Sequence, residues 1–270
     1  LNCDYRLILE RTEDIYKGIK YVAMALGIKN IVLGIELNKP LAIKAFERFT
    51  DIDVVALKKQ YSMGSEKHLI YCTTGRKVPV GKMPFDVGVC VQNIKTVIAC
   101  YEAIELNKPL TEIVLTVSGN GVKKPCNLKL PIGTPFGYIL DHAGSDDDKV
   151  KKLIAGGPMM GKSVSANEFP VIKGTSGILM MTDKEAQPRK VGNCLRCGKC
   201  INACPMGLEP FLLCRMSKNN MFEDTEANRI MDCIECGSCE FTCPANIPLL
   251  DYIRYGKNKT GQLIRSRNQK

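Results

Sequence analysis

The sequence predicts a mixed α/β fold in three consecutive parts. In the first part, short apolar runs alternate with segments whose apolar residues follow helical spacing. In the second part, short strand-like pieces are separated by glycine and proline turns. In the third part cysteines are crowded, since nine of the 14 cysteines lie between Cys194 and Cys243. These observations predict an α/β domain, a small β-rich domain and a cysteine-rich domain, in that order.

The first part, residues 1–109, is expected to be an α/β unit. Asp4 is placed to cap a helix that Gly27 ends, and Pro40 is typical of a helix start. A strand, a helix and a strand in this order predict parallel pairing. The predicted elements are a helix ending at Gly27, a buried strand at 30–37, a helix at 40–49, a strand at 53–58 and a helix at 95–105.

The second part, residues 110–182, is expected to be rich in β-structure. Residues 111–119 alternate as a strand, and the following pieces are separated by Asn-Gly, Pro-Ile-Gly-Thr-Pro and Gly-Gly-Pro turns. Three aspartates at 146–148 predict a solvated turn. The polar segment 183–190 contains a proline and is interpreted as a linker.

The composition is that of a globular protein. Of the 270 residues, 45% are hydrophobic and 24% are charged, and the mean hydropathy is −0.07, which excludes a disordered chain. No apolar run approaches the roughly 18 residues that a membrane-spanning helix needs. The first residues contain neither a starting methionine nor the apolar core of a signal peptide, and we expect the chain to begin inside a domain.

The positive charge is concentrated at the carboxyl end. The formal net charge is +10, and six basic residues lie in the basic tail, residues 254–270, which has no acidic residue. Because aromatic residues are not interleaved with the basic ones, no nucleic-acid partner is expected. Contact with anionic lipid or with an acidic partner stays an alternative, but a solvated, disordered end is the expected state of this tail.

Two cysteine runs carry the chemistry of the third part, residues 191–250. Each run reads C-x2-C-x2-C-x3-C-P, and matching cysteines of the two runs are 39 residues apart. A zinc site takes four tetrahedral ligands, usually as two separate pairs, so this pattern is atypical of zinc. It is typical of two [4Fe-4S] clusters, in which three cysteines of one run bind one cluster and the fourth binds the other.

The ligand sets are therefore expected to cross over between the runs. Gly198 and Gly237 would let the backbone approach the clusters and offer N–H groups to their sulfur atoms. The spacer predicts helices at 208–216 and 223–231, so the module is expected to be mainly helical. The first cluster is assigned to Cys194, Cys197, Cys200 and Cys243, and the second to Cys233, Cys236, Cys239 and Cys204.

The remaining cysteines are interpreted as buried thiols of a protein in a reducing compartment, because they are too scattered for a disulfide scaffold. Cys214 lies outside the duplication, since Ile253 is found 39 residues later. The scattered five are Cys3, Cys72, Cys90, Cys100 and Cys126.

Outside the cysteine runs, short motifs follow one another in a particular order. They include Tyr5-Arg6-Leu7, Gly34-Ile35-Glu36, Thr74-Gly75-Arg76, Asp86-Val87-Gly88, Pro131-Ile132-Gly133-Thr134-Pro135 and Gly156-Gly157-Pro158-Met159-Met160-Gly161. Together with the runs, this set resembles the C subunit of the Rnf (Rsx) electron transport complex, from residue 1 to about 257.

The resemblance implies a peripheral subunit at the cytoplasmic face of the cell membrane, in a complex that passes electrons between NADH and ferredoxin and translocates sodium ions or protons. The implied partners are the membrane and flavin subunits and a ferredoxin-like subunit. The first part is similar to the Rossmann-like flavoprotein subunit of complex I, which binds FMN and NADH. The second part is similar to the β-grasp module that binds soluble ligands.

The similarity to the complex I flavoprotein also implies cofactor contacts. A glycine allows close backbone approach to a flavin, a carboxylate can orient a ribose, and an amide with a hydroxyl can bind phosphate oxygens. A polar loop and a helix cap at Asn93 are the simpler interpretations of the same residues. The expected FMN contacts are Gly64, Ser65, Glu66, Gln92, Asn93 and Thr96.

One departure from the family pattern is a missing glycine-rich phosphate loop. The sequence contains no G-x-G-x-x-G motif, and in the family this loop would precede residue 1. We therefore expect this fragment alone to be inactive with NADH. Neither His68 nor His142 has a partner pattern for acid–base catalysis, so no catalytic side chain is assigned.

Two other functions are compatible with the sequence. A soluble flavin and iron–sulfur reductase that activates corrinoids would have the same domain order. A pure electron relay would contain the clusters but no flavin.

Overall fold

The computed structural model describes residues 1–145, 149–164, 169–187 and 189–268. The chain divides into two compact units, one of Leu1–Lys77 with Val87–Gln187 and the other of Val78–Asp86 with Pro188–Lys270, and each unit is described by itself. The aspartates at 146–148 lie outside the described residues. No helix among the described residues is long and apolar enough to cross a membrane.

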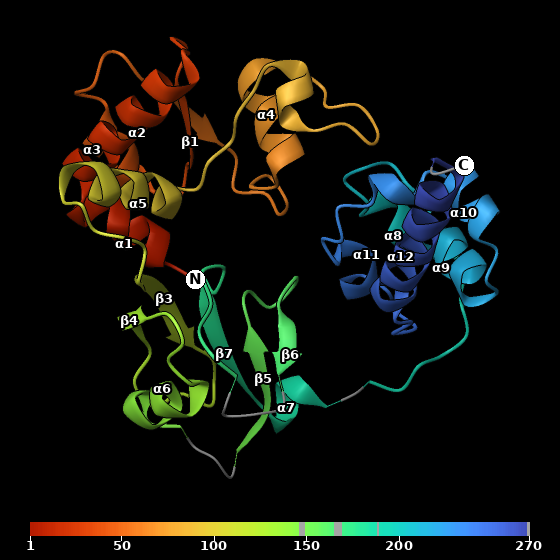
Figure 1. Ribbon diagram of the computed structural model, residues 1–270. Coiled ribbons are helices and arrows are strands. Elements are labelled where there is room, and N and C mark those ends of the chain that lie inside the picture. Colours follow the sequence, from red (N-terminus) through yellow and green to blue (C-terminus); the bar gives the residue numbers. More distant parts are fainter. Residues whose placement is uncertain (146–148, 165–168, 188, 269–270) are drawn as a thin grey trace. The chain divides into compact units, whose positions relative to one another are not determined.

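The first unit begins with two helices where the sequence predicts one (Figure 1). Helices α1 (Cys3–Glu10) and α2 (Thr12–Leu26) are separated at Arg11, whose φ of −130° and ψ of 37° are not helical. Asp4 lies within the first turn of α1 and is not its cap. The hydroxyl of Thr116 instead accepts hydrogen bonds from the backbone N–H of Asn2 and Cys3, at 3.2 and 3.1 Å, which satisfies amides at the helix start.

The predicted strand, helix and strand follow, and their parallel pairing is confirmed. Strand β1 (Val32–Glu36) pairs in parallel with β2 (Asp53–Leu57), and α3 (Pro40–Phe46) connects them with Pro40 in its first turn. Gly27 ends α2 with a φ of 64°, as predicted. Strand β1 is less buried than expected, because only Ile35 of its five residues is buried.

Two further helices complete this half of the unit. Helix α4 (Glu66–Thr74) packs close to β1, since a Cβ added at Gly34 would lie 2.7 Å from a methyl carbon of Leu69. Helix α5 (Ile94–Glu105) is the second of these helices, and the 3₁₀ turn that precedes it in the chain, η1 (Pro84–Val87), belongs mostly to the second unit. The core of this half lies between the helices and β1, and its buried side chains include Ile15, Ile35, Phe46 and Val97.

The second half of the unit is a five-stranded sheet with one helix of eight residues on it (Figure 1). The strand order is β4-β3-β7-β5-β6, with β3 and β7 parallel and the other pairs antiparallel. Phe136 and Ile139 of α6 pack on Leu115 and Ile178. The elements are β3 (Glu112–Ser118), β4 (Cys126–Pro131), α6 (Phe136–Ala143), β5 (Val150–Ala155), β6 (Lys162–Val164) and β7 (Gly177–Thr182).

The predicted linker at 183–190 starts with a single helical turn, α7 (Asp183–Ala186). Thr182 and Glu185 form a capping box at its start, which explains why these polar residues are ordered.

The described residues of the second unit after position 188 contain helices and no strand, as the sequence predicts. The helix predicted at 223–231 is divided into α10 and η2, because Arg229 has a φ of 62°. The elements are α8 (Lys199–Asn202), α9 (Pro210–Lys218), α10 (Phe222–Ala227), η2 (Ile230–Asp232), α11 (Ser238–Phe241) and α12 (Leu249–Asn268).

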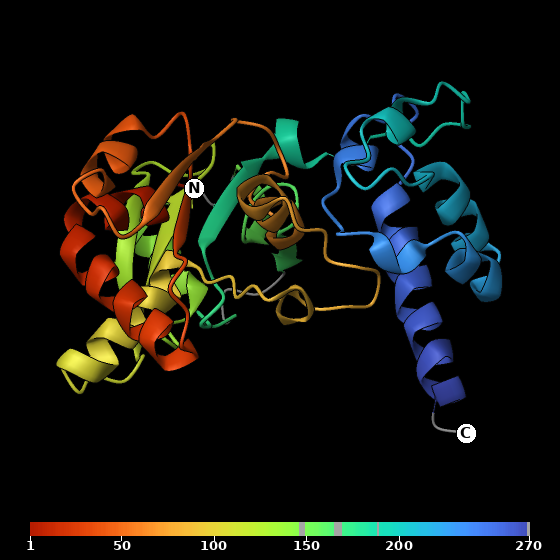
Figure 2. The ribbon, with the colours of Figure 1, turned by 90° about the horizontal axis from the view of Figure 1, so that it is seen from above.

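The expectation of a disordered basic tail is wrong. Residues up to Asn268 continue helix α12, which Figure 2 shows along its length. The helix buries Ile253, Gly256 and Thr260, and Thr260 shares a hydrogen bond of 2.6 Å with the hydroxyl of Thr225 on α10. Most of the positions that face the core in the tail are small or polar rather than large and apolar, so the pattern contains no clear amphipathic signal.

The duplication of the cysteine runs extends into the helices. Helix α11 starts 39 residues after α8, and α12 starts 39 residues after α9. The related helices α9 and α12 meet at Ser217 and Gly256, which are themselves 39 residues apart. A Cβ added at Gly256 would collide with the Ser217 hydroxyl oxygen, so the close packing requires glycine at this position.

Candidate metal centres and cofactor pocket

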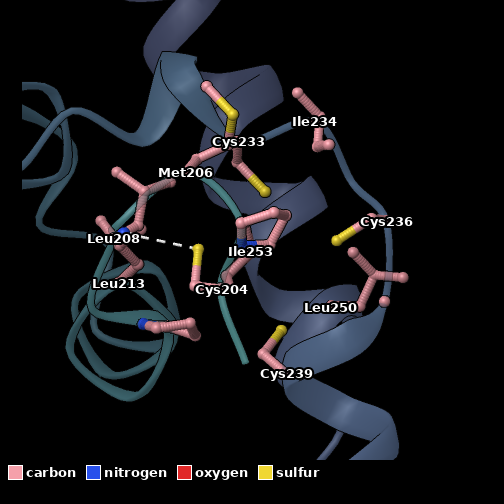
Figure 3. Close-up of a pocket in the computed structure, with 13 residues that line it drawn as sticks. Cys204, Met206, Leu208, Leu213, Cys233, Ile234, Cys236, Cys239, Leu250 and Ile253 are labelled. Carbon is pink, nitrogen blue, oxygen red and sulfur yellow. Dashed lines mark hydrogen bonds between the residues drawn. The ribbon is translucent and has the colours of Figure 1, made fainter. Parts of the chain in front are cut away.

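The four cysteines predicted to hold the second cluster line one pocket. Cys204 comes from the first run, and Cys233, Cys236 and Cys239 come from the second. Figure 3 shows their four sulfur atoms around the same space. The structure therefore brings together cysteines of both runs, as the crossed assignment requires. The rest of the lining is mainly apolar and includes Met206, Leu208, Leu213, Ile234, Leu250 and Ile253.

In each run, one short loop positions the cysteines. In the second loop Glu235 and Gly237 have positive φ angles of 55° and 80°, and in the first loop Arg196 and Gly198 have 52° and 72°. These left-handed residues curl the backbone between successive cysteines. They also turn N–H groups toward sulfur, because the N–H of Glu235 donates to the sulfur of Cys233 at 3.4 Å.

Burial makes two thiols of the second set, those of Cys233 and Cys239, hard to ionise without a metal. It raises the pKa of Cys239 to about 12, with the nearby Cys233 as the next cause. Burial also raises the pKa of Cys233, against the opposing effects of the Glu235 N–H and the Lys257 ammonium. Iron binds thiolate, so filling this site must release the thiol protons.

The first predicted set is more exposed. Cys194 and Cys197 are exposed, whereas Cys200 and Cys243 are half-buried. Burial raises the pKa of Cys200, and the nearby Cys243 thiol adds to this effect. Cys243 of the second run thus lies near Cys200 of the first. Among the described residues, no three His, Cys, Asp or Glu side chains are arranged to share a single metal ion; in a four-iron cluster each thiolate binds an iron of its own.

The donor set fits two [4Fe-4S] clusters better than any other metal site. Eight thiols are supplied by two duplicated loops, one complete set surrounds a single pocket, and backbone N–H groups point at ligand sulfur. Leu208 adds a second such contact, because its N–H donates to the sulfur of Cys204 at 3.4 Å.

Three charged residues near the second run were not predicted from the sequence. Lys257 donates to the backbone carbonyl of Cys233 at 2.6 Å and to Glu235 at 3.1 Å. Arg254 donates to the other carboxylate oxygen of Glu235 at 3.2 Å. For Arg254 and Lys257, the signal that could have found them is the same offset of 39 residues, because Arg215 and Lys218 occupy the equivalent positions in the first repeat. The position equivalent to Glu235 holds Arg196, so the repeat gives no such signal there.

The prediction of buried thiols is correct for some cysteines only. Cys214 is buried, as expected, and burial raises its pKa to about 11. Cys3 is also buried, while Cys100 and Cys126 are half-buried. For Cys72 and Cys90 the prediction is wrong, because both are exposed. At Cys90 the apolar sequence neighbours were misleading, since this residue lies in a segment without regular structure.

The predicted flavin contacts are only partly gathered in one place. A large pocket of the first unit lies beside α1, β1 and α4, and Gly64, Gln92 and Asn93 are among its lining residues. Ser65, Glu66 and Thr96 are not among those lining residues. Ser65 instead bonds the Nδ1 atom of His68 at 2.6 Å.

The pocket has features that fit one side of a planar, partly polar ligand. The position of Gly64 is open, since an added Cβ would meet no atom within 4 Å. Asn93 caps α5 by accepting from the N–H of Lys95 at 2.9 Å, and its amide nitrogen donates to Asp4 at 3.2 Å. The cap interpretation of Asn93 is thus confirmed, while its contact with a flavin stays a prediction.

Three families match successive parts of the chain. Residues 1–102 match the family described as "Nuo51 FMN-binding domain", residues 114–163 match "SLBB domain", and residues 187–244 match "4Fe-4S dicluster domain".

Curated relatives are similar over most of the chain. It is 43% identical over 218 residues to the C subunit of the ion-translocating oxidoreductase complex of Rhodobacter capsulatus, which covers 79% of this chain and 42% of the relative. It is 41% identical over 229 residues to the C subunit of the proton-translocating ferredoxin:NAD(+) oxidoreductase complex of Clostridium ljungdahlii, covering 84% and 50%. A sodium-translocating counterpart from Acetobacterium woodii is 38% identical over 232 residues, covering 84% and 52%.

A solved structure has a similar fold. An NAD⁺-reducing [NiFe]-hydrogenase in the air-oxidized state aligns with a TM-score of 0.57 at 16% sequence identity, covering 83% of this chain and 45% of the other. The chain spans only about half, or less, of the length of these curated relatives. Over the part that it spans, the chain belongs to the family of the C subunits of ion-translocating oxidoreductase complexes.

Proposed function

We propose that the chain is part of the electron-transfer subunit of a membrane-bound, ion-translocating NADH:ferredoxin oxidoreductase complex. In this proposal it passes electrons between FMN, which exchanges hydride with NADH, and partner subunits through two [4Fe-4S] clusters. The observation that carries the proposal is the pocket lined by Cys204 of one run and by Cys233, Cys236 and Cys239 of the other. The names of the relatives, two of which include ferredoxin and NAD⁺, support the wider assignment.

In this proposal, successive segments of the chain have different roles. Residues 1–109 form the carboxyl-terminal part of a Rossmann-like FMN and NADH module, and the parallel β1 and β2 support this. Residues 110–182 form a β-grasp domain, which is supported by the parallel β3 and β7 inside a mixed sheet. Residues 191–250 hold the clusters, and the described part of the basic tail, residues 254–268, extends this module through α12.

The protein residues have three tasks in this proposal. The thiols must lose their protons and hold the clusters at fixed positions, and the left-handed loop residues give the backbone the required curl. N–H groups of Leu208 and Glu235 stabilise negative charge on ligand sulfur. Apolar side chains around the pocket exclude water. When bound, each cluster takes up and releases one electron at a time.

The proposed location is the cytoplasmic face of the cell membrane, through contact with other subunits of the complex. The proposed partners are the membrane and flavin subunits and a ferredoxin-like subunit. The relatives are named as subunits of complexes, which supports partners of this kind.

The first test is the metal content of the anaerobically reconstituted chain. We expect about eight irons and eight acid-labile sulfides per chain, which correspond to two cubanes. Iron and sulfide assays together with EPR spectroscopy of the reduced protein measure this. Tightly bound zinc without iron would contradict the proposal.

A second measurement separates this function from its alternatives. The full-length protein, purified with its membrane complex, should contain FMN and should reduce its clusters when NADH is added. Clusters without a flavin spectrum would indicate a pure relay. Recovery of the full-length protein in the soluble fraction, with activity on corrinoids, would indicate the soluble reductase.

A further inference from the structure

The two repeats are built alike but differ in charge around their cysteine loops. In the second repeat, Glu235 stands between the first two cysteines, and Arg254 and Lys257 on α12 both bind its carboxylate. In the first repeat, Arg196 occupies the position of Glu235. Arg196 forms no ion pair within the described part of the chain. The three residues Glu235, Arg254 and Lys257 are called the α12 clamp below.

Lys257 is the member of the α12 clamp that reaches the ligand-bearing backbone. Its ammonium donates to the carbonyl of Cys233 at 2.6 Å and to a carboxylate oxygen of Glu235 at 3.1 Å. Only 24% of its side chain is exposed, so water weakens its charge less than on an open surface. The equivalent Lys218 of the first repeat instead lies 5.7 Å from the ring centre of Tyr252.

The α12 clamp acts on the residue whose N–H touches ligand sulfur. Glu235 has a left-handed backbone, with a φ of 55°, a conformation that costs free energy for a residue with a side chain. In this conformation its N–H donates to the sulfur of Cys233 at 3.4 Å. Two cations on its carboxylate hold the residue in place, which helps to keep this N–H directed at the sulfur.

We propose that Lys257 is a positioning residue that holds the second cysteine loop through the Cys233 carbonyl and Glu235, and thereby sets the reduction potential of the cluster bound there separately from that of the other cluster. This proposal rests on the proposed cluster function. Hydrogen bonds to sulfur, local charge and exposure are the features by which a protein changes a cluster potential. Lys257 contributes to the first two.

The direction of the effect follows from charge. Reduction adds one negative charge to the cluster, so a nearby cation favours the reduced form and raises the potential, whereas an anion lowers it. Removal of the Lys257 charge should therefore lower the potential of the cluster held by Cys204, Cys233, Cys236 and Cys239. Loss of an N–H contact to sulfur would shift the potential in the same direction.

The experiment is an EPR-monitored redox titration of the reconstituted chain with Lys257→Gln. The potential of the second cluster should become more negative, while that of the first cluster stays at its wild-type value. Ligand variants Cys197→Ser and Cys236→Ser assign the two signals, because each alters its own cluster. The matched control is Lys218→Gln, which removes the same charge at the equivalent position and should leave the second cluster unchanged.

Further variants distinguish an effect of charge on the cluster potential from an effect of misfolding. Lys257→Arg keeps the cation and should keep the potential close to that of the wild type. Arg254→Gln removes the other cation that binds Glu235 and should also make the potential of the second cluster more negative. Hydrogen exchange of the 233–237 amides should be faster in Lys257→Gln, with iron content and the thermal midpoint of the second unit close to wild type.

The outcomes distinguish the two proposals. If the wild-type chain holds no clusters, the proposed function fails. If two clusters are present but Lys257→Gln shifts neither potential, or shifts both equally, the role of Lys257 is wrong and the proposed function stands. If Lys257→Gln does not fold, the negative shift in Arg254→Gln decides, and an unchanged potential in that variant overturns the inference.

Discussion

At the scale of the residue, the assignment of cysteines depends on spacing more than on chemical surroundings. The crossed sets follow from the repeat alone, and Cys204 does lie with Cys233, Cys236 and Cys239 around one pocket. A loop with three cysteines, spaced two residues apart, wraps around one cluster. The fourth cysteine of the run then points in another direction, toward the other cluster. Covalent geometry, rather than the local environment, makes this part of the site predictable from the sequence.

Replacement of Cys204 tests the crossing. In Cys204→Ala the cluster of the second run should be lost, because the crossed assignment makes Cys204 the fourth ligand of its set. Iron content should fall to about half of the wild-type value of about eight, and the EPR spectrum should match that of Cys236→Ala. A spectrum that matches Cys197→Ala would contradict the crossed assignment. Cys214→Ala, which replaces a buried thiol outside both sets, is the control and should keep both clusters.

Other residues could not be assigned so directly. The expected flavin contacts depend on a resemblance, and only Gly64, Gln92 and Asn93 line the large pocket. Ser65 and Glu66 are at the start of α4, where the direction of a side chain depends on how the helix packs. A helix start and a ligand loop have the same residue preferences, so the sequence alone could not separate them.

At the scale of the element, the close crossing of α9 and α12 stabilises the second unit. Gly256 is buried against Ser217 and Ile230, and a Cβ added there would lie within 3.0 Å of side-chain atoms of both. The Ser217 hydroxyl has no hydrogen-bond partner among the described residues, so it does not hold the helices together. Close van der Waals packing of the two helices does so instead.

Substitutions at the two glycines of α12 test this crossing. Gly256→Ala should destabilise the second unit by roughly 1–3 kcal/mol, because overpacking forces the helices apart. Gly261→Ala should stabilise it by up to about 1 kcal/mol, because alanine favours a helix and the nearest atom, on Met231, would be 3.8 Å away. Thermal unfolding of the anaerobic holoprotein measures both changes. If the two substitutions changed the stability of the second unit equally, α9 and α12 would not be tightly packed at Gly256.

Element prediction succeeded where periodicity or turn residues are strong, and failed at α12. The parallel β1 and β2 follow from apolar runs around a proline-started helix. Helix α12 presents Gly256 and Thr260 to the core, and its many basic residues suggested a solvated tail. Its order depends on tertiary partners such as Thr225 and Glu235, which no local pattern reveals.

At the scale of the whole molecule, the two units have separate cores and different dependence on metal. The core of the second unit includes Cys239 and is packed against further cysteines that are predicted to be ligands. The two cores of the first unit contain no predicted ligand cysteine among their described residues. Metal binding should therefore contribute to the stability of one unit only.

Removal of iron tests this difference. Anaerobic chelation after oxidation should increase amide hydrogen exchange in α8, α9, α11 and α12, because the buried thiols lose the clusters that neutralise and connect them. Exchange in β3, β7 and α2 should stay unchanged. Mass spectrometry of peptides from the same sample measures both units at once. If exchange in the sheet increased as much as exchange in the helices of the second unit, the conclusion that only one unit depends on metal would be contradicted.

The contact between Ser217 and Gly256 has a consequence for the history of the module. A residue beside a two-fold axis faces its own copy, so in a homodimer of single repeats both positions would have the same side chain. Two serines would collide here, and two glycines would weaken both helices. Fusion of the repeats into one polypeptide allows serine on one side and glycine on the other. The same freedom allows Arg196 in one repeat and Glu235 in the other, so the two cysteine loops can carry opposite charges.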